Sequence, residues 1–148
     1  MVAETTFRWL PITTMPDGTP LRLPLHVIRG EQPGPTLGLS AAVHGDEMVP
    51  SVSTIRRVLD LVNPAELSGT IMAVPICNPL GAGSKSRHTP GDGMNLNNAF
   101  LIPEDDDEDA AVARSVTQQI ATVLTKDFLA NLDYHIDFHT GGDNHCVH

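Results

Sequence analysis

The sequence predicts an α/β fold in which a mixed, mostly parallel β-sheet is flanked by helices. Short runs of β-type composition alternate with stretches whose apolar residues recur at helical spacing. Strands that alternate with helices build a sheet with helices on its faces. Polar residues also follow directly after two of these strands, at 44–47 and at 139. The carboxyl ends of strands are where open α/β sheets hold their ligands.

The first part of the chain predicts three strands and a tight turn. Phe7–Ile12 has a β-type composition, and the turn residues MPDGTP follow at 15–20. Leu21–Ile28 alternates apolar with polar residues, as a half-buried strand does. Pro24 within it predicts an edge position or a bulge. Thr36–Val43 consists of small and apolar residues, which predicts a central strand buried on both faces.

The second part predicts two helices and two strands. Met48–Val62 has apolar residues at helical spacing, and Thr70–Ile76 predicts another buried strand. Residues 80–94 predict a long irregular loop, and loops of this length in compact domains are usually functional. An amphipathic stripe over about Asp107–Leu129 predicts a long helix, whose acidic start suits the positive end of the helix dipole. Asp133–Phe138 predicts the last strand.

Composition excludes several classes of protein. The 148 residues, 41% of them hydrophobic, predict one globular domain with a moderate core. The net charge is −9, with six negative charges in Glu104–Asp109. The sequence has no basic patch, so no nucleic-acid partner is expected. No apolar run approaches the roughly 20 residues that cross a bilayer, so no membrane partner is expected. Cys77 and Cys146 make a poor disulfide framework, which predicts a cytoplasmic protein.

The strongest motif is His44-Gly45-Asp46-Glu47, which follows the central strand. Histidine nitrogen and carboxylate oxygen are zinc ligands, and here they are three residues apart. We expect Gly45 to let the backbone turn sharply between them. A second interpretation is a helix start, in which Asp46 caps the helix and Glu47 complements its dipole. The motif alone leaves both interpretations open.

His139 favours the metal interpretation. It follows the last predicted strand and precedes Thr140-Gly141-Gly142. Two strands that deliver His44, Glu47 and His139 to one sheet edge would make a three-ligand zinc site with a position left for water. Asp137 points to the same strand face and can orient a ligand, whereas His135 lies further from the end and is expected to be structural. The alternative is a buried His139 that pairs with Asp137.

These motifs together resemble those of the succinylglutamate desuccinylase/aspartoacylase family of the zinc carboxypeptidase superfamily. The pattern is HGDE, then an Arg in the loop SKSRHTPGDGMNLNN, then DFHT after a long helix, and it covers about residues 21–142. The resemblance implies a carboxypeptidase-like fold and a Zn²⁺ ion bound by His44, Glu47 and His139. It also implies that Arg87 polarises the scissile carbonyl and stabilises the oxyanion, which needs preorganised charge.

The chain departs from the family pattern at two points. The family has an Asn-Arg pair that binds the substrate carboxylate, and the matching positions are Asn97 and Asn98. An amide cannot form the charged, two-pronged contact of an Arg. Asn95 falls where some relatives have an Asp that orients a ligand, and its carbonyl can accept the same bond. The family's general base is a Glu well beyond the third ligand, and no Glu follows Glu108.

These observations predict that residues 1–148 are the N-terminal portion of a single zinc-hydrolase-like catalytic domain, apparently incomplete at the C-terminus. The expected function is zinc-dependent hydrolysis of an amide bond in an N-acylated amino acid or a similar small molecule. The expected partners are that substrate and either a second copy or a completing polypeptide. Two alternatives stay open. One is a non-catalytic zinc-binding or assembly subunit without a general base, and the other is a purely structural metal site.

Overall fold

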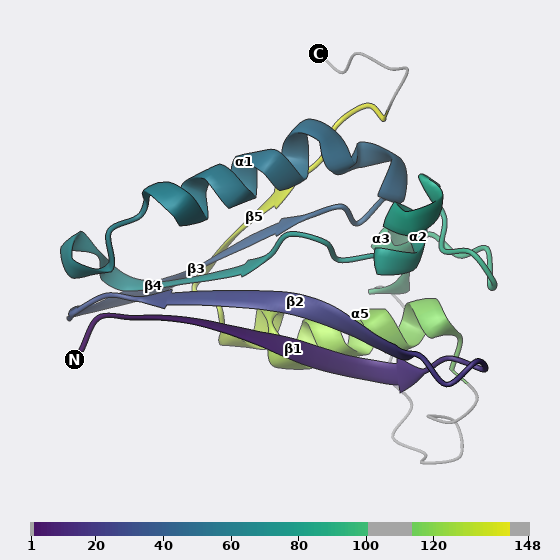
Figure 1. The fold of residues 1–148 in the computed structure, drawn as a ribbon, viewed down its shortest axis with the longest axis horizontal. Coiled ribbons are helices and arrows are strands. Elements are labelled where there is room, and N and C mark those ends of the chain that lie inside the picture. Colours follow the sequence, from purple (N-terminus) through teal and green to yellow (C-terminus); the bar gives the residue numbers. More distant parts are fainter. Residues whose placement is uncertain (1, 101–113, 143–148) are drawn as a thin grey trace.

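The computed structural model describes residues 2–100 and 114–142, which form a five-stranded sheet between two layers of helices (Figure 1). The strands are β1 (Glu4–Thr14), β2 (Pro20–Arg29), β3 (Gln32–Ala41), β4 (Ser68–Val74) and β5 (Tyr134–Phe138). The helices are α1 (Met48–Leu61), α2 (Pro79–Ser84), α3 (Leu96–Ala99) and α5 (Val116–Asp127), with 3₁₀ turns η1 (Gly45–Glu47), η2 (Pro64–Glu66) and η3 (Leu129–Asn131). None of these helices is long and apolar enough to cross a membrane.

The sheet is mixed, as the sequence predicts, and its strand order is β1-β2-β4-β3-β5. β3 runs parallel to both neighbours, β4 and β5, whereas β2 pairs antiparallel with β1 and β4. The parallel pairings therefore make up half of the pairings rather than most of them. β3 is central, as predicted, and its last four residues are buried.

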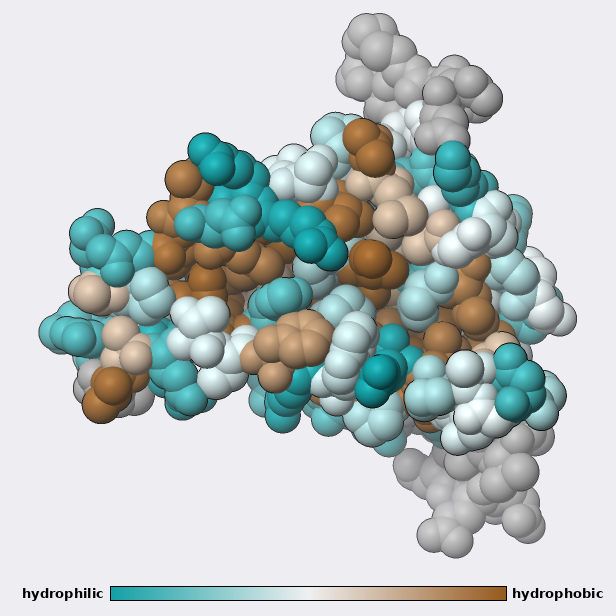
Figure 2. Space-filling model, viewed as in Figure 1, coloured by the Kyte–Doolittle hydropathy of each residue, from teal (hydrophilic) through white to brown (hydrophobic). Residues whose placement is uncertain are grey.

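Each face of the sheet has its own core. On one face, α1 contributes Val52 and Ile55, which pack against Ile28, Leu39 and Ile71 of the strands. On the other face, α5 contributes an apolar stripe that packs against the inward side chains of β1 and β2. Figure 2 shows apolar side chains at the surface between α1 and the sheet, bordered by hydrophilic residues. Burial on both faces holds the strand ends, and the residues after them, in fixed positions.

Three expectations about the elements need correction. α5 begins at Val116, and the expected start near Asp107 lies outside the described residues, as does the acidic run at 104–109. Residues 79–84, most of them expected to be loop, form α2, because the Asn78 side chain accepts a hydrogen bond from the third residue of the helix. Pro24 lies on an interior strand, but β4 pairs with β2 only from His26 onward, so Pro24 has β1 alone as neighbour.

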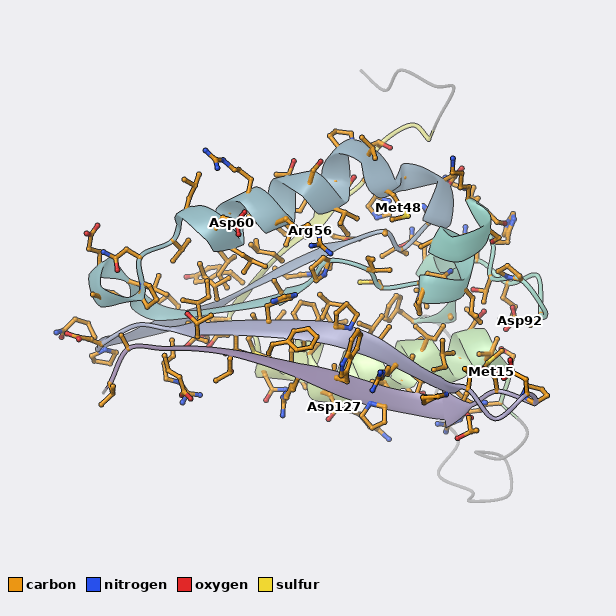
Figure 3. The ribbon with its side chains drawn as sticks, viewed as in Figure 1. Met15, Met48, Arg56, Asp60, Asp92 and Asp127 are labelled. Carbon is orange, nitrogen blue, oxygen red and sulfur yellow. The ribbon has the colours of Figure 1, made fainter. Side chains whose placement is uncertain are left out.

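The segment between α2 and α3 is tied to α5 by one carboxylate. Asp92 lies close to the start of α5 (Figure 3), where its side chain accepts hydrogen bonds from the Thr117 backbone N–H at 2.8 Å and the Thr117 hydroxyl at 2.9 Å. It also accepts from the Met94 backbone N–H at 3.0 Å. Burial raises the pKa of Asp92, but these hydrogen bonds outweigh it and hold the pKa below its ordinary value.

Candidate metal centre

Parallel pairing of β3 and β5 brings the two histidine motifs together. Ala41, the last residue of β3, lies beside Phe138, the last residue of β5. His44 follows the first strand and His139 follows the second, so both leave the sheet at the same edge. Glu47 reaches the same point because η1 turns the chain back toward the edge before α1 begins. Glu47 and His139 are therefore in direct contact although they are 92 residues apart in the sequence.

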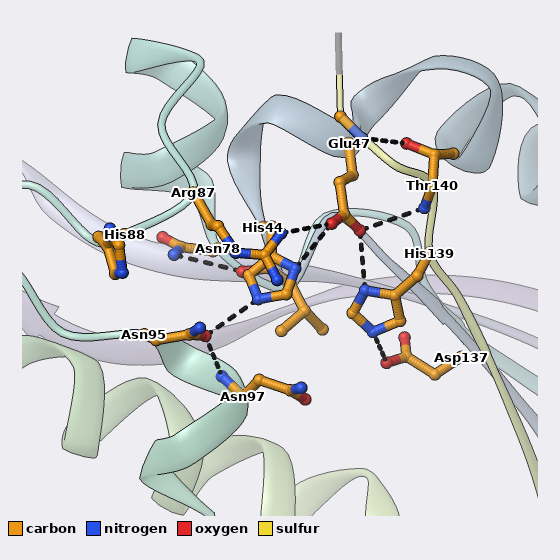
Figure 4. A network of polar contacts seen from close by, with 12 residues as sticks. His44, Glu47, Asn78, Arg87, His88, Asn95, Asn97, Asp137, His139 and Thr140 are labelled. Atoms are coloured by element: carbon orange, nitrogen blue, oxygen red, sulfur yellow. Dashed lines mark hydrogen bonds and ion pairs between the residues drawn. The ribbon is translucent and has the colours of Figure 1, made fainter. Parts of the chain in front are cut away.

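The Glu47 carboxylate is the centre of the cluster (Figure 4). Its Oε1 lies 2.9 Å from His44 Nδ1, and its Oε2 lies 2.8 Å from His139 Nδ1. The Arg87 guanidinium donates to Oε1 at 2.9 Å, and the Thr140 backbone N–H donates to Oε2 at 3.2 Å. One ligand atom from each of His44, Glu47 and His139 lies within 4.8 Å of the other two. The structure thus brings the three predicted ligands together.

The outer nitrogens of both histidines face hydrogen-bond acceptors. His44 Nε2 lies 3.0 Å from the Asn95 side-chain oxygen, and His139 Nε2 lies 2.7 Å from an Asp137 carboxylate oxygen. Both Nε2 atoms face acceptors, and both Nδ1 atoms face the Glu47 carboxylate, where a metal ion would take the place of the Nδ1 protons. Two imidazole nitrogens and a carboxylate thus converge on one point. This chemistry fits a divalent metal, and the outer bonds are those that orient metal-bound histidines.

Glu47 is held in its ionised form. Its side chain is almost fully buried, and burial raises the pKa of a carboxyl group. The hydrogen bonds from the Thr140 backbone and from His139, together with the charges of His44 and His139, outweigh burial and leave the pKa of Glu47 below its ordinary value. A buried carboxylate that stays ionised is suited to bind a cation.

A second layer of polar residues supports His139. Asp137 accepts a hydrogen bond from the Ser40 hydroxyl at 2.5 Å, and this hydroxyl lies 2.8 Å from His135 Nε2. Burial lowers the pKa of His135, whose ring packs edge-on against Phe128. Asp137 takes the orienting place that the sequence predicts, and His135 contacts the support of the cluster rather than its centre. Ser40 was missed, because a serine in an apolar strand has no distinguishing signal.

Gly45 is required for a different reason than the one expected. Its φ is not positive, so no left-handed turn separates the ligands. A Cβ at this position would lie 1.9 Å from the Gly81 carbonyl carbon, inside the backbone of α2. The Gly45 N–H donates to the Ser86 carbonyl at 2.9 Å. The glycine therefore allows α2 to pack directly on the ligand turn, which sets the position of the loop that carries Arg87.

The helix-cap interpretation of the HGDE motif is wrong. Glu47 is the N-cap of α1, and its side chain makes no cap hydrogen bond. The Asp46 Oδ1 atom is buried and has no hydrogen-bond partner among the described residues. Glu47 instead directs both carboxylate oxygens toward the histidines.

The loop with Arg87 is anchored by Asn78, which the sequence analysis took only as the end of a strand. Asn78 is fully buried, and its amide donates to the Thr89 hydroxyl at 3.0 Å while its oxygen accepts from the Gly81 N–H at 2.9 Å. The Arg87 side chain is about half exposed, so it is held at one end by Glu47 and open to solvent along its length. This is a suitable position for a group that contacts a ligand.

Asn97 and Asn98, the predicted substrate-binding residues, lie on α3 beside the cluster of His44, Glu47 and His139. The Asn97 backbone N–H donates to the same Asn95 oxygen that faces His44 (Figure 4). Asn98 is exposed, and its side chain makes no hydrogen bond to another described residue. A cavity of about 230 Å³ adjoins this region, and it has apolar walls with a polar side formed by Ser40, Asn97, His135 and Asp137.

Comparison with known proteins identifies the family. The family model for the succinylglutamate desuccinylase/aspartoacylase catalytic domain matches residues 33–147. The chain belongs to this family. It is 32% identical over 121 residues to the N-alpha-acetyl-L-2,4-diaminobutyric acid deacetylase of Halomonas elongata, covering 81% of this chain and 32% of that protein. The chain thus spans about a third of the length of this relative.

Solved structures confirm the carboxypeptidase-like fold. A succinylglutamate desuccinylase/aspartoacylase from Rhodobacter sphaeroides superposes with a TM-score of 0.77 at 25% identity, covering 95% of this chain and 40% of that one. A metallo-carboxypeptidase from Burkholderia cenocepacia superposes with a TM-score of 0.61 at 18% identity, covering 93% of this chain and 36% of that one. The second similarity concerns the fold alone.

Proposed function

We propose that this chain is the metal-binding part of a zinc-dependent deacylase that hydrolyses the amide bond of an N-acylated amino acid. The observation that carries the proposal is the cluster of two imidazole nitrogens and one buried carboxylate, whose ligand atoms lie within 4.8 Å of one another. Membership of a family whose relatives include a deacetylase supports the class of reaction.

Zinc fits this donor set better than calcium or magnesium, which prefer oxygen ligands. His44, Glu47 and His139 would hold the ion, and three protein ligands leave one position for water or substrate. When bound, zinc supplies a Lewis acid that polarises a carbonyl and lowers the pKa of a bound water. Asn95 and Asp137 lie at the outer nitrogens of the two imidazoles and orient these rings for metal binding.

Arg87 supplies positive charge beside the cluster. Its guanidinium lies 2.9 Å from Glu47 Oε1 while the side chain is half exposed, so it faces both the metal ligands and the space where a substrate arrives. A fixed cation there stabilises the oxyanion that forms when an amide carbonyl is attacked. Asn97 and Asn98 on α3 contact the far end of the substrate through neutral hydrogen bonds.

The relative in Halomonas elongata is named for a substrate with an acetyl group on an amino acid nitrogen. We propose the same class of substrate here, a small N-acyl amino acid. Asn98 instead of an Arg predicts weaker binding of a free carboxylate. The same residue favours a second candidate function, in which the chain keeps the metal but serves as a non-catalytic assembly subunit.

The test is release of free amine from Nα-acetylated amino acids, measured with the purified chain and with any longer polypeptide that contains it. We expect activity that is lost on chelation, returns with zinc, and falls about 10²–10³-fold in Arg87→Ala. An Arg57→Ala variant, on the outer part of α1, is the control and should keep full activity. Full activity after thorough chelation would refute the proposal, and zinc binding without any amine release would favour the assembly subunit.

A further inference from the structure

Strand β1 presents a long open edge. It has 11 residues, and among the described residues it pairs with β2 alone. Its residues Glu4 to Trp9 are all exposed, and Phe7 and Trp9 are 49% and 45% exposed despite their apolar rings. Natural proteins usually protect such an edge with lysines, prolines or a covering element, because it can pair with another strand. Among the described residues, Pro11 and a bulge that follows it interrupt the edge, and Glu4 and Arg8 are its exposed charged residues.

The prolines show which backbone groups of β1 face outward. In an antiparallel pair, opposite residues alternate between hydrogen-bonded and non-hydrogen-bonded pairs. Trp9 lies opposite Pro24, which has no N–H, so this is a non-hydrogen-bonded pair. The N–H and C=O groups of Thr5, Phe7 and Trp9 therefore point away from β2. Pro11 is the next residue of this alternating series and has no N–H, so the outward N–H donors end at Trp9.

The edge is complementary to itself in one antiparallel register. If Thr6 lies opposite Thr6 of a second copy, then Glu4 lies opposite Arg8 and Thr5 opposite Phe7. The same register places Ala3 opposite Trp9 and Val2 opposite Leu10. Opposite charges, a Thr pair and a β-branched residue against an aromatic ring are the cross-strand pairs that stabilise sheets. Each pair occurs twice about a twofold axis, except the Thr6 pair on the axis itself.

Neighbouring registers lose this match. The outward N–H and C=O groups of the two β1 strands must face each other to form hydrogen bonds. The register can therefore shift only so that Thr5 and Phe7 stay in hydrogen-bonded pairs. The next register in one direction places Glu4 opposite Leu10 and Arg8 opposite Thr6, which leaves both charges unpaired. The next register in the other direction pairs Glu4 with Thr6 and Arg8 with Val2. Larger shifts place Glu4 opposite Glu4 or Arg8 opposite Arg8.

We propose that two copies of this chain associate through their β1 edges, antiparallel about Thr6, so that the two five-stranded sheets become continuous. Residues 2–10 of each copy form the new ladder, with Glu4 and Arg8 setting the register. Within the described part of the chain, Glu4 pairs with Arg29 at 4.0 Å, and both side chains are about half exposed, so this contact leaves Glu4 accessible to a second copy. A second copy is the occupant that this self-complementary charge pattern fits.

The aromatic side chains lie on one face of the continuous sheet. Phe7 packs edge-on against Trp9 with ring centroids 5.0 Å apart, and the Arg22 guanidinium lies 4.5 Å from the centre of the Trp9 ring. These contacts hold the rings upright along the edge. In the proposed register Trp9 extends over Ala3 of the second copy and Phe7 over Thr5, so small residues receive the large rings. Pairing thereby buries part of the exposed apolar surface.

The first test is a crosslink across the twofold axis. Thr6 faces its own copy in a non-hydrogen-bonded pair, whose Cα atoms are typically about 4.5 Å apart, within the range that a disulfide spans. With Cys146→Ser as background, Thr6→Cys should form a covalent dimer under mild oxidation. Thr14→Cys is the matched control, because Thr14 lies on the same strand beyond the paired residues, and it should not crosslink at the same protein concentration.

The second test is a charge exchange measured by sedimentation equilibrium. The parent chain should show a mass that rises with concentration toward two copies. Arg8→Glu places two like-charged pairs in the dimer, and we expect its dissociation constant to be about tenfold higher than that of the parent. Glu4→Arg combined with Arg8→Glu should restore the parent value. Circular dichroism checks that each variant keeps its fold.

Each outcome decides the proposal. A selective Thr6→Cys crosslink and recovery in the double variant support it. A single-copy mass at every concentration overturns it, as does equal crosslinking of Thr6→Cys and Thr14→Cys. A dimer that ignores Arg8→Glu, or a double variant as weak as the single one, shows that another surface or another register holds the copies together and also overturns it. None of these outcomes depends on zinc or on deacylation.

Discussion

Replacement of Asp137 by Asn isolates the orientation of His139 from the ligand set itself. Asp137 accepts from His139 at 2.7 Å and from the Ser40 hydroxyl at 2.5 Å. An Asn side chain has the same shape but only one acceptor oxygen. It can serve Ser40 or His139, and its NH₂ group presents a second donor to whichever partner is left. Whichever way the amide turns, the imidazole loses its charge-assisted hydrogen bond at Nε2.

The size of the effect follows from that lost bond. Removing an outer partner of a metal-bound histidine typically costs 10–100-fold in metal affinity. This corresponds to about 1.4–2.7 kcal/mol in binding free energy. We expect the upper part of this range, because Asp137 also loses its charge beside the positive centre. Ser40→Ala should have the same direction and a smaller effect, since Ser40 acts only through Asp137.

Zinc affinity can be measured by competition with a chromophoric chelator. Asp133→Asn is the matched control, because Asp133 accepts from the Thr36 backbone N–H at 2.7 Å, directly before β5 and away from the cluster. It should bind zinc as the parent does. If Asp137→Asn also bound zinc with the parent affinity, the orienting role of Asp137 would be wrong.

The remaining predictions concern the scaffold and the substrate. Gly45→Ala places a Cβ in the backbone of α2 and should lower the free energy of unfolding by about 1–3 kcal/mol. Gly83→Ala is the control, because a Cβ there meets no atom within 4 Å and should not destabilise the chain. Urea unfolding measures both. Asp92→Asn should cost about 1–3 kcal/mol at neutral pH. Because the folded pKa of Asp92 is lowered, this difference should be full above about pH 4 and disappear as the pH falls through the folded value. Asn98→Arg should lower the KM for an N-acetyl amino acid but not for its methyl ester.

The position of the metal cluster could be predicted from the sequence because it depends on regular structure. Small and apolar residues before His44 and a β-type run before His139 indicate two strands, and the carboxyl ends of parallel strands lie at a common edge, although β5 itself is largely exposed. The HGDE and DFHT motifs then supply ligands at both ends. The interior place of β3 follows from the small and apolar residues of its second half, which is buried, and the helical spacing of residues 48–62 predicts α1.

Other features depend on contacts that no local pattern reveals. The role of Gly45 comes from the close approach of α2, which lies far from it in the sequence. Ser40 has the composition of any strand residue, and its role exists only because β5 places Asp137 beside it. The start of α5 did have a local signal. Ser115 and Gln118 form a capping box, but the acidic run earlier in the chain offered a competing helix start.

The metal content of the chain tests the central claim most directly. After removal of metal, incubation with zinc and gel filtration, the account predicts one zinc ion per chain. His44→Ala and His139→Ala should each lose most of this zinc, while His26→Ala, whose ring lies against Phe7 on the sheet, should keep it. A parent chain that retains no zinc, or histidine variants at positions 44 and 139 that retain as much as the parent, would contradict the account.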